Sequence, residues 1–524
     1  MSEPASGICI DSMRDPACFP HDVHDVEVLE THGNWIVLAG EYAYKIKKPV
    51  DFGFMNFSSL ERRRFYCEEE LRLNRRLAPD LYHRVVPITG SFETPRIDGK
   101  GEALEYAVVM TRFEHAQRLD AVLRRDELTG EALERLGREI AAFHSQAPAT
   151  DSRDPYSTPE QLHGMVADNF RDCRKLLKNE DQAFLAKVEA VAEEKFRSLE
   201  KLLSSRVQAG CIRECHGDLH LGNLVFHEGR IQAFDCIEFN PEFRWIDTAN
   251  EAAFLSMDLR YRGCPELAGR WLNAYLEHSG DYEAVPLLGF YESYRAMIRT
   301  KVALLRAEQQ PGTESAERER QSARDYMKLA HERLQPGEGG ILLMMGLSAS
   351  GKSRLARELV PRLPALCLRS DVERKRLFGL DPLADSGARL DAGIYSAEAT
   401  QKTYQRLAGL AVSVANAGWT VIIDATFLSR SARDRFRTLA AEHELAFGVI
   451  QADAPLSTLE ERIRKRKAAG TDASEADVAV LHRQLERMDP LDPEERQDSL
   501  IVPTDQEVDY AMVCENILRL IRAR

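Results

Sequence analysis

Two separate residue patterns of the kind that serves phosphoryl transfer lie in this chain, and they constrain its fold more than any other feature. A His-Gly-Asp tripeptide at 216–218 is followed by Asn223 and then Asp235. More than a hundred residues later, 346–353 fits the P-loop pattern G-x-x-x-x-G-K-[ST]. The two patterns belong to unrelated folds, so we expect two domains, each with its own nucleotide site.

Length and composition agree with a multidomain globular protein. The chain has 524 residues, of which 44% are hydrophobic and 29% charged, and two or three domains are expected at this length. No apolar run approaches the roughly 18 to 20 residues that span a bilayer. The first 20 residues lack the apolar core of a signal peptide, so a cytoplasmic protein without a membrane partner is expected.

Cysteine spacing and net charge exclude further classes. The ten cysteines follow neither a disulfide nor a metal-ligand rhythm, which favours reduced cysteines in the core. A formal charge of −14 disfavours broad, non-specific nucleic-acid binding, although a local basic groove stays compatible with it.

A polar connector divides the chain. Residues 308–313 are polar and broken by Pro and Gly, a strongly charged helical stretch follows at 314–334, and a second Pro-Gly cluster leads into the apolar strand 341–345. We therefore predict a first domain at 1–306, a linker with a charged helix at 307–340, and a second domain at 341–524.

The first domain begins with strand-like sequence and ends with helical sequence. Strands are expected at 26–31 and 35–39 around a turn, with a third at 42–47. A helix is expected at 58–77, and another strand at 106–110 precedes a mostly helical stretch. A small sheet with one helix followed by a helical lobe is the plan of a two-lobed, kinase-like α+β domain.

The 216–235 segment supplies the groups that phosphoryl transfer needs. One carboxylate must accept or orient the proton of the attacking hydroxyl, while an amide and a second carboxylate hold Mg²⁺ against the phosphates. Two short strands, expected at 224–226 and 231–234, bring Asp218, Asn223 and Asp235 to one place. We expect His216 to brace the loop, and no role follows from the sequence for His220.

This segment resembles the aminoglycoside phosphotransferase and choline kinase-like superfamily, whose signature is H-G-D-x-x-x-x-N followed by an Asp-led metal strand. The resemblance implies that Asp218 is the catalytic base and that Asn223 and Asp235 are magnesium ligands. It implies that Lys45 contacts the α- and β-phosphates of ATP and that Glu70 is its ion-pair partner.

Neighbouring residues leave some of these assignments open. Lys47 lies on the same strand face as Lys45, and Glu68 and Glu69 compete with Glu70. Glu238 could touch a metal or form a surface salt bridge.

The second motif lies in the context that a P-loop requires. An apolar strand at 341–345 precedes the loop and a helix at 352–359 follows it, so backbone N–H groups and the helix N-terminus face the phosphates. Lys352 is expected to reach the β- and γ-phosphates as a catalytic group, and Ser353 to coordinate Mg²⁺. The other residues expected to contact the nucleotide are Gly346, Ser348, Ala349, Ser350 and Gly351.

Two further segments complete the expected second site. The apolar strand 420–424 ends in Asp424, which suits the magnesium-associated Walker B role. The segment 368–376 resembles the S-D-x-x-R segment of gluconate-kinase-like, zeta-toxin-like and polynucleotide-5′-kinase-like P-loop enzymes. That resemblance implies that Asp371 is the general base and Arg374 an acceptor contact. A helix N-cap is the alternative role for Asp371.

Basic residues at 462–466 suggest a lid. Arg462 and Arg466 share one helical face, and kinases of this class close an Arg-bearing lid over ATP, where Arg466 would act in catalysis. The alternative is a solvated basic helix. Arg430 and Arg433 are weaker candidates for the same role.

The whole chain therefore resembles a fusion of an aminoglycoside-phosphotransferase-like domain with a small P-loop kinase domain of the AAA-33 type. The second domain should be α/β, with a parallel sheet and helices on both faces. The resemblance implies a bifunctional ATP- and Mg²⁺-dependent phosphotransferase that acts on hydroxyl acceptors.

Two alternatives stay open. The P-loop kinase could be the single active enzyme, regulated by a nucleotide-binding kinase-like module. A small-molecule acceptor is expected, and a polynucleotide 5′-hydroxyl is the other candidate. The motifs do not encode the acceptor or the oligomeric state.

Overall fold

The fold was taken from a computed structural model. It describes residues 7–53, 55–150, 156, 158–382, 384, 393–469 and 477–522. The chain forms two compact units: Met1–Ala132, Phe143–Ala167 and Glu200–Asp258 make the first, and Leu133–Ala142, Asp168–Leu199 and Leu259–Arg524 make the second.

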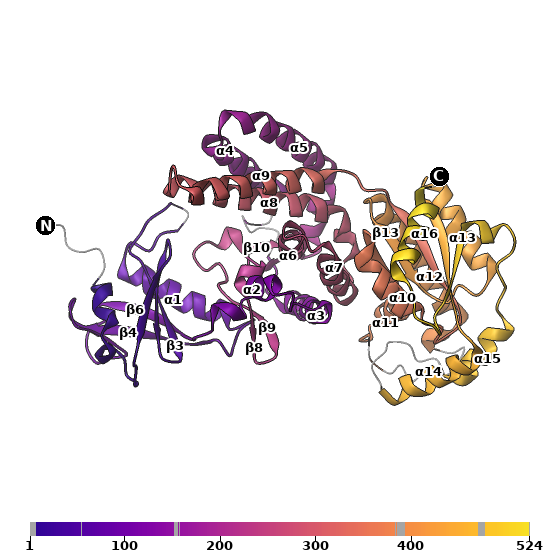
Figure 1. Ribbon diagram of the computed structural model, residues 1–524, viewed down its shortest axis with the longest axis horizontal. Coiled ribbons are helices and arrows are strands. Elements are labelled where there is room, and N and C mark those ends of the chain that lie inside the picture. The colour runs from indigo at the N-terminus through magenta and orange to yellow at the C-terminus, as the bar shows by residue number, and fades with distance from the viewer. Residues whose placement is uncertain are drawn as a thin grey trace. The chain divides into compact units, whose positions relative to one another are not determined.

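An antiparallel sheet with one helix opens the first unit. Its strand order is β1-β2-β3-β6-β4-β5. The strands are β1 (Val26–Glu30), β2 (Asn34–Ala39), β3 (Tyr42–Lys47), β4 (Tyr82–Gly90), β5 (Pro95–Ile97) and β6 (Glu105–Thr111). Helix α1 (Leu60–Asn74) begins where Ser59 accepts a hydrogen bond from the Arg62 N–H, and it packs against β4 and β6 (Figure 1). The expected strands and helix are present, and β4 and β5 were not predicted.

Helices dominate the chain after β6. They are α2 (Leu119–Arg124), α3 (Gly130–Gln146), α4 (Pro159–Leu176), α5 (Asn179–Gln208), α6 (Thr248–Tyr261), α7 (Pro265–Ser279) and α8 (Val285–Gln309). Two small antiparallel ladders lie between α5 and α6: β8 (Leu224–His227) pairs with β9 (Arg230–Ala233), and β7 (Ile212–Glu214) pairs with β10 (Trp245–Asp247). The N-terminal part of the chain is thus a kinase-like α+β fold, as predicted.

The charged helix expected between the domains is α9 (Glu314–Leu334). Thr313 caps its first turn, and its apolar side chains are buried along one face, including Tyr326 and Met327. That face packs along α8 within the second unit. Helix α9 is therefore part of the folded structure, with its charges on the outer face.

A five-stranded parallel sheet forms the core of the C-terminal part. Its order is β12-β13-β11-β14-β15. The strands are β11 (Gly340–Met345), β12 (Ala365–Arg369), β13 (Thr420–Asp424), β14 (Ala446–Asp453) and β15 (Ser499–Pro503). The helices are α10 (Lys352–Leu359), α11 (Ser370–Leu377), α12 (Ala397–Asn416), α13 (Arg430–Glu442), α14 (Leu456–Ala469), α15 (Val478–Glu486) and α16 (Tyr510–Arg522).

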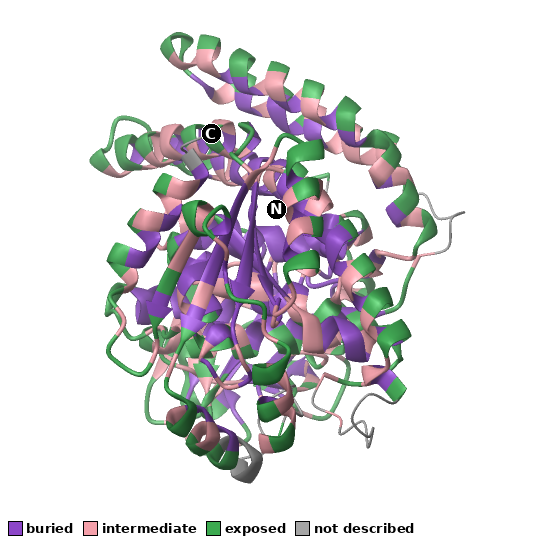
Figure 2. Cartoon of the chain, turned by 90° about the vertical axis from the view of Figure 1, so that its right-hand side faces the viewer, coloured by how far each residue is buried: buried purple, intermediate pink, exposed green. Residues whose placement is uncertain are grey.

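Both faces of this sheet are covered. Leu342 and Met344 of β11 lie in the core that α10 and α16 complete, and the alternate residues Ile341 and Leu343 are also fully buried. Helices α12 and α13 contact the sheet as well, and Figure 2 shows buried strands between helices that expose only their outer sides. This is the α/β architecture predicted for the domain. The loops that follow β11 and β13 lie at the carboxyl ends of these two neighbouring parallel strands.

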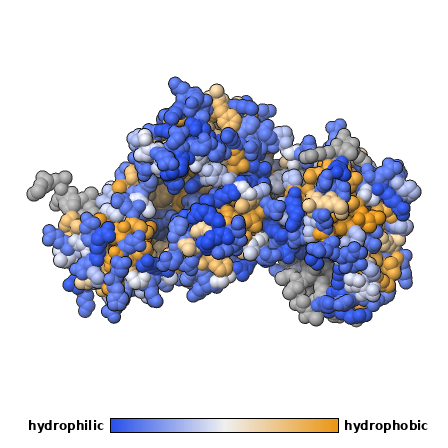
Figure 3. All heavy atoms as spheres, in the orientation of Figure 1, coloured by the Kyte–Doolittle hydropathy of each residue, from blue (hydrophilic) through white to orange (hydrophobic). Residues whose placement is uncertain are grey.

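The surface is predominantly polar. Hydrophilic residues cover most of the face drawn in Figure 3, with scattered apolar patches. Within the described ranges, no helix combines the length and the apolar character that a membrane crossing requires.

Candidate active sites

In the first unit, one buried carboxylate contacts two lysines. Lys45 and Lys47 project from the same face of β3 because they are two residues apart in a strand. Glu70 on α1 places Oε1 2.8 Å from Lys45 Nζ and Oε2 2.8 Å from Lys47 Nζ. Lys45 also pairs with Asp235, and Lys47 pairs with Glu238. Burial raises the pKa of a carboxyl group, but the two ammonium groups outweigh it and hold the pKa of Glu70 below its usual range.

Exposure distinguishes the two lysines. The Lys47 side chain is fully buried, whereas Lys45 contacts Asp235, whose side chain is 47% exposed. Lys45 therefore lies on the open side of the cluster. The competing glutamates point elsewhere: Glu68 pairs with Arg64, and Glu69 hydrogen-bonds to Arg72. Of the three glutamates, Glu70 is the one that contacts the lysines.

The loop after β7 brings Asp218 and Asn223 together. Asn223 Nδ2 donates to Asp218 Oδ2 at 2.7 Å and to the Asp218 carbonyl at 3.1 Å. His220 Nε2 lies 3.4 Å from the same carboxylate oxygen, and its Nδ1 accepts the Gly222 N–H at 3.0 Å. His220, to which the sequence assigned no role, thus orients the Asp218 carboxylate.

The same loop is tied to the Asp235 segment. His216 Nε2 hydrogen-bonds to the Phe234 carbonyl at 3.0 Å, and the Phe234 N–H donates to the Asn223 carbonyl at 3.0 Å. The Asp235 N–H donates to the Tyr82 hydroxyl at 3.1 Å, and Asp235 has a positive φ of 63°. Burial lowers the pKa of His216, which favours a neutral imidazole that braces the loop. Asp218, Asn223, Asp235 and Lys45 are thereby joined in one hydrogen-bonded framework.

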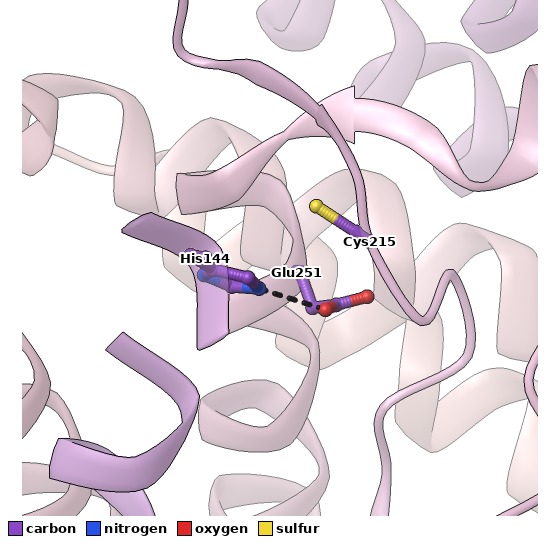
Figure 4. Close-up of side chains that lie close together, drawn as sticks. All are labelled: His144, Cys215 and Glu251. Atoms are coloured by element: carbon purple, nitrogen blue, oxygen red, sulfur yellow. Dashed lines mark hydrogen bonds and ion pairs between the residues drawn. The ribbon is translucent and has the colours of Figure 1, made fainter. Parts of the chain in front are cut away.

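A buried glutamate on α6 supports this loop from below. Glu251 accepts the His216 N–H at 3.0 Å and the Gly217 N–H at 2.5 Å, and His144 Nε2 lies 2.8 Å from its Oε2 (Figure 4). Burial raises the pKa of Glu251, but the hydrogen bond and charge of His144 outweigh it and lower the pKa to about 2. Asp258 lies about two turns further along α6, and its carboxylate accepts the Leu221 N–H at 3.0 Å.

The arrangement of His144, Cys215 and Glu251 has the spacing of a metal site, but its hydrogen bonds indicate another role. The three ligand atoms lie within 4.8 Å of one another and all three residues are buried. Both Glu251 oxygens already accept backbone N–H groups, and the Cys215 thiol donates to the Ile246 carbonyl at 3.6 Å. These contacts describe a support for the loop at 216–223.

In the second unit, the P-loop joins β11 to α10. Gly346, Ala349 and Gly351 have positive φ values of 146°, 64° and 94°. These backbone conformations allow the tight turns of the loop. Lys352 Nζ donates to the carbonyls of Gly346 at 2.9 Å and Leu347 at 2.7 Å. The Ser350 hydroxyl oxygen is buried with no hydrogen-bond partner among the described residues.

Asp424 lies at the end of β13, beside the P-loop strand. It is in register with Met344 of β11 on one side and with Arg369 of β12 on the other. Arg369 Nε lies 3.6 Å from Asp424 Oδ2, and Ser353 hydrogen-bonds to the Asp424 carboxylate. Burial raises the pKa of Asp424. Ser353 and Asp424, both predicted as metal ligands, are therefore in contact.

The segment at 369–376 forms the end of β12 and helix α11. The N-cap of α11 is Arg369, so the alternative role of Asp371 as N-cap is wrong: Asp371 lies in the first turn, where a carboxylate favours the helix dipole. Arg374 is buried, and its Nη1 donates to the Ile394 carbonyl at 2.9 Å and to Thr400 Oγ1 at 3.1 Å. Its Nε has no hydrogen-bond partner in the described part of the chain.

Of the two arginines predicted to lie on a lid, Arg462 on α14 contacts the P-loop. Its guanidinium donates to the Ala349 carbonyl at 3.3 Å and to the Thr504 carbonyl at 2.6 Å. The Arg466 side chain lies outside the described residues. Gln484 on α15 accepts the Ser348 N–H at 2.8 Å, a contact that the sequence did not suggest.

The weaker lid candidates have other partners. Arg433 is almost fully buried and forms a bidentate ion pair with Glu495, with distances of 2.6 and 2.9 Å. Arg430 pairs with Asp434 and Asp492 on the surface. Both arginines stabilise the region around α13.

The residues present fit a magnesium nucleotide at each site. Carboxylate and amide oxygens are among the ligands that Mg²⁺ prefers, and Asn223 and Asp235 would supply them in the first site. In the second site, the P-loop residues with positive φ and the buried Ser350 hydroxyl, which has no hydrogen-bond partner among the described residues, lie at the N-terminus of α10, where backbone N–H groups favour a phosphate.

Two parts of the chain match known families. Residues 58–288 match the phosphotransferase enzyme family, and residues 341–491 match an AAA domain family designated AAA_33. Among solved structures, an amicoumacin kinase in complex with AMP-PNP, Ca²⁺ and amicoumacin covers 59% of this chain and 88% of its own, with 14% identity and a TM-score of 0.39. The adenylyl sulfate (APS) kinase of Mycobacterium tuberculosis covers 35% and 98%, with 22% identity and a TM-score of 0.27.

Relatives that span both domains also exist. Uncharacterized protein Rv2004c of Mycobacterium tuberculosis and Uncharacterized protein Mb2027c of Mycobacterium bovis are each 30% identical to this chain over 496 residues, which is 92% of this chain and 96% of each relative. The chain therefore belongs to the family of these mycobacterial proteins, and it is a kinase-type phosphotransferase in which a phosphotransferase-family domain precedes a P-loop domain.

Proposed function

We propose that this protein is a bifunctional phosphotransferase that moves the γ-phosphoryl group of ATP to hydroxyl acceptors at two sites. The observation that carries the proposal is the cluster of Lys45, Glu70, Asp235, Asp218 and Asn223, residue types that a kinase-type site needs and that come from four separate segments of the chain. The second site adds Lys352 and Ser353 at the start of α10 and Asp424 at the carboxyl end of β13.

In the first site, Asp218 would take or orient the proton of the acceptor hydroxyl, with its carboxylate held by Asn223 and His220. Lys45, kept charged by Glu70 and Asp235, would contact the α- and β-phosphates. Asn223 and Asp235 would hold a Mg²⁺ ion, which neutralises charge on the phosphates when bound.

In the second site, Lys352 would leave the P-loop carbonyls for the β- and γ-phosphates. Ser353 and Asp424 would hold Mg²⁺, and Asp371 would accept the acceptor proton. Arg462 and Arg466 would place positive charge over the transferring group. Arg374, with its buried Nε, would contact the acceptor.

A pooled acceptor screen tests the proposal. Turnover of ATP-Mg²⁺ is followed by ³¹P NMR with sugars, choline-like alcohols, nucleosides, oligonucleotides and aminoglycosides, using the wild type and the variants Asp218→Ala and Lys352→Ala. We expect at least one product that disappears in the Asp218 variant alone and another that disappears in the Lys352 variant alone. If both variants keep every ATP-dependent activity of the wild type, the proposal is wrong.

A second candidate function follows from one contact. Glu277 of α7, inside the phosphotransferase-family region, lies 3.3 Å from Arg369 of the P-loop domain. This contact would give the preceding kinase-like module a physical route by which to regulate the P-loop site, as a single active P-loop kinase with a regulatory module requires. In that case Asp218→Asn would abolish no phosphorylated product, although ATP would still bind to the first site.

A further inference from the structure

The acceptor-side segment of the P-loop domain is held at both ends by one helix terminus. Within the segment 368–376, Asp371 and Arg374 lie between two further arginines, Arg369 and Arg376. Arg369 Nη1 lies 3.3 Å from Glu277 Oε1. Arg376 donates to the Glu277 carbonyl and lies 3.5 Å from the His278 carbonyl. Both arginines therefore meet the last turn of α7.

The end of α7 is shaped to receive these arginines. Gly280 caps the helix in the left-handed conformation, with a φ of 73°. A Cβ atom at Gly280 would lie 2.5 Å from Nε of Arg376, so the glycine also leaves room for that side chain. Cations at a helix C-terminus interact favourably with its carbonyls and dipole.

The strand that precedes the segment is held by the same region. Strand β12 is an edge strand, so the N–H and C=O of Cys367 have no neighbouring strand on that side. Asn273 Oδ1 of α7 accepts the Cys367 N–H at 2.8 Å, and the Tyr282 hydroxyl donates to the Cys367 carbonyl at 3.2 Å. Asn273 and Tyr282 therefore satisfy the backbone N–H and C=O of Cys367 on the open side of β12.

An ion-pair cluster fixes α7 against the helix that follows the P-loop. Arg270 of α7 contacts Glu134 at 2.8 Å and Glu358 of α10 at 3.1 Å. Arg357 of α10 contacts the same Glu134 at 2.7 Å. Helix α10 begins at Lys352. Helix α7 therefore contacts two elements that carry residues of the second site, α10 and β12.

Arg369 connects this docking to the site itself. One nitrogen of its guanidinium faces Glu277 and another lies 3.6 Å from Asp424. Asp424 in turn hydrogen-bonds to Ser353. Because a guanidinium is planar and rigid, a carboxylate on one side fixes the direction of the nitrogens on the other.

We infer that Glu277 is a positioning residue for the P-loop site: it orients Arg369 beside Asp424 and fixes the start of the acceptor-side segment. The phosphotransferase-family domain thus contributes a residue to the geometry of the second site. This inference rests on the proposed function for its kinetic consequence, whereas its structural consequence is independent of that function.

The test uses the full chain with Asp218→Asn, so that the first proposed site is silent. Glu277→Gln removes the charge at nearly constant volume, and Glu277→Asp keeps the charge on a shorter side chain. Glu283→Gln is the matched control, because Glu283 is exposed and lies six residues further along the same region. Hydrogen exchange of the amides at 365–377 is measured together with kcat and KM for ATP turnover.

We expect Glu277→Gln to speed exchange in this segment at least fivefold and to lower kcat about tenfold with KM for ATP nearly unchanged. Glu277→Asp should lie between the wild type and the Gln variant, and Glu283→Gln should match the wild type. Because a smaller folded fraction would also lower the apparent kcat at constant KM, kcat is normalised to the fraction of folded protein, and rescue by Glu277→Asp separates positioning from a purely structural role.

Unchanged exchange at 365–377 in Glu277→Gln would overturn the inference, and so would a kcat equal to that of the control. If the parent protein turns over no ATP, the proposed function of the second site fails, and the exchange data alone then decide whether Glu277 holds the segment.

Discussion

The Glu251 carboxylate lies 2.8 Å from His144 Nε2, at the base of the loop that carries Asp218. Neither residue belongs to a motif, and they are 107 positions apart in the sequence. Glu251 also accepts two backbone N–H groups of the loop. It therefore connects α3, through His144, and its own helix α6 to the loop that carries Asp218.

Glu251 should make the free energy of unfolding depend on pH in the acidic range. Its pKa in the folded chain is about 2, below the usual value of 4.5, so its contribution is complete above pH 4.5 and is lost as the pH falls toward 2. We expect Glu251→Gln to lower the free energy of unfolding by about 2 to 4 kcal/mol at pH 7 and by progressively less between pH 4.5 and 2. Chemical denaturation across this pH range measures the difference, with Glu283→Gln as control. A difference that stays constant with pH would contradict the prediction.

The two lysines on β3 should separate binding from stability. Lys47→Met leaves Glu70 and Glu238 buried without one of their cations, and we expect a loss of about 3 to 5 kcal/mol in stability. Lys45→Met should cost less stability, because Lys45 lies beside a half-exposed Asp235, but should weaken ATP binding to the first site at least tenfold.

Thermal unfolding and titration with a fluorescent ATP analogue, both in a Lys352→Ala background, check these expectations. Lys47→Met/Glu238→Gln, which removes a charge of each sign, should recover part of the stability. The reverse result, with Lys47 controlling ATP affinity and Lys45 stability, would exchange the proposed roles.

The P-loop contacts predict a graded series at the second site. Lys352→Ala should reduce turnover at least a hundredfold, since Lys352 is the residue proposed to reach the transferring phosphate. Arg462→Ala should have a smaller effect, of about tenfold, because Arg462 contacts the loop backbone at Ala349 and Thr504. Steady-state kinetics in an Asp218→Asn background measure both, with Arg464→Ala, an exposed arginine paired with Glu460, as control. Equal effects of Arg462→Ala and Arg464→Ala would argue against a lid.

The edge of the parallel sheet gives a further prediction. Asn273→Ala leaves the buried Cys367 N–H without its acceptor, which costs about 1 to 3 kcal/mol. Tyr282→Phe removes the matching donor and should cost a similar amount. Thermal unfolding of the full chain measures both variants. The double variant should show non-additive loss because both side chains serve one residue. Strict additivity would mean that the two bonds act separately.

Local sequence was sufficient for much of the fold and for the motif residues. The strand-like sequence at 42–47, which continues the two strands before it, predicted β3, and the apolar runs at 341–345 and 420–424 predicted β11 and β13 of the parallel sheet. Strand β5 was missed because it has only three residues, and the nine-residue β4 was missed because it contains a proline.

The supporting contacts could not be predicted in the same way. The sequence left Glu68, Glu69 and Glu70 as alternatives, since the choice depends on which helix face meets β3. Glu251 gave one indirect signal, a carboxylate inside an apolar helix, which requires buried partners. The partners themselves, His144 and the loop N–H groups, follow only from tertiary packing. The same holds for Glu277 and Arg369, which are 92 residues apart.

The bridge between Glu70 and the two lysines has a consequence for control of the first site. In protein kinases, an ion pair between a strand lysine and a helix glutamate must be in place for activity, and the position of that helix controls it. Here an outward swing of α1 would break two pairs at once and leave Lys47 buried beside Glu238 alone. Such a movement is costly in a dry interior. Glu70 therefore links the position of α1 to both lysines of β3, so an outward movement of this helix would separate more charge than the loss of a single pair.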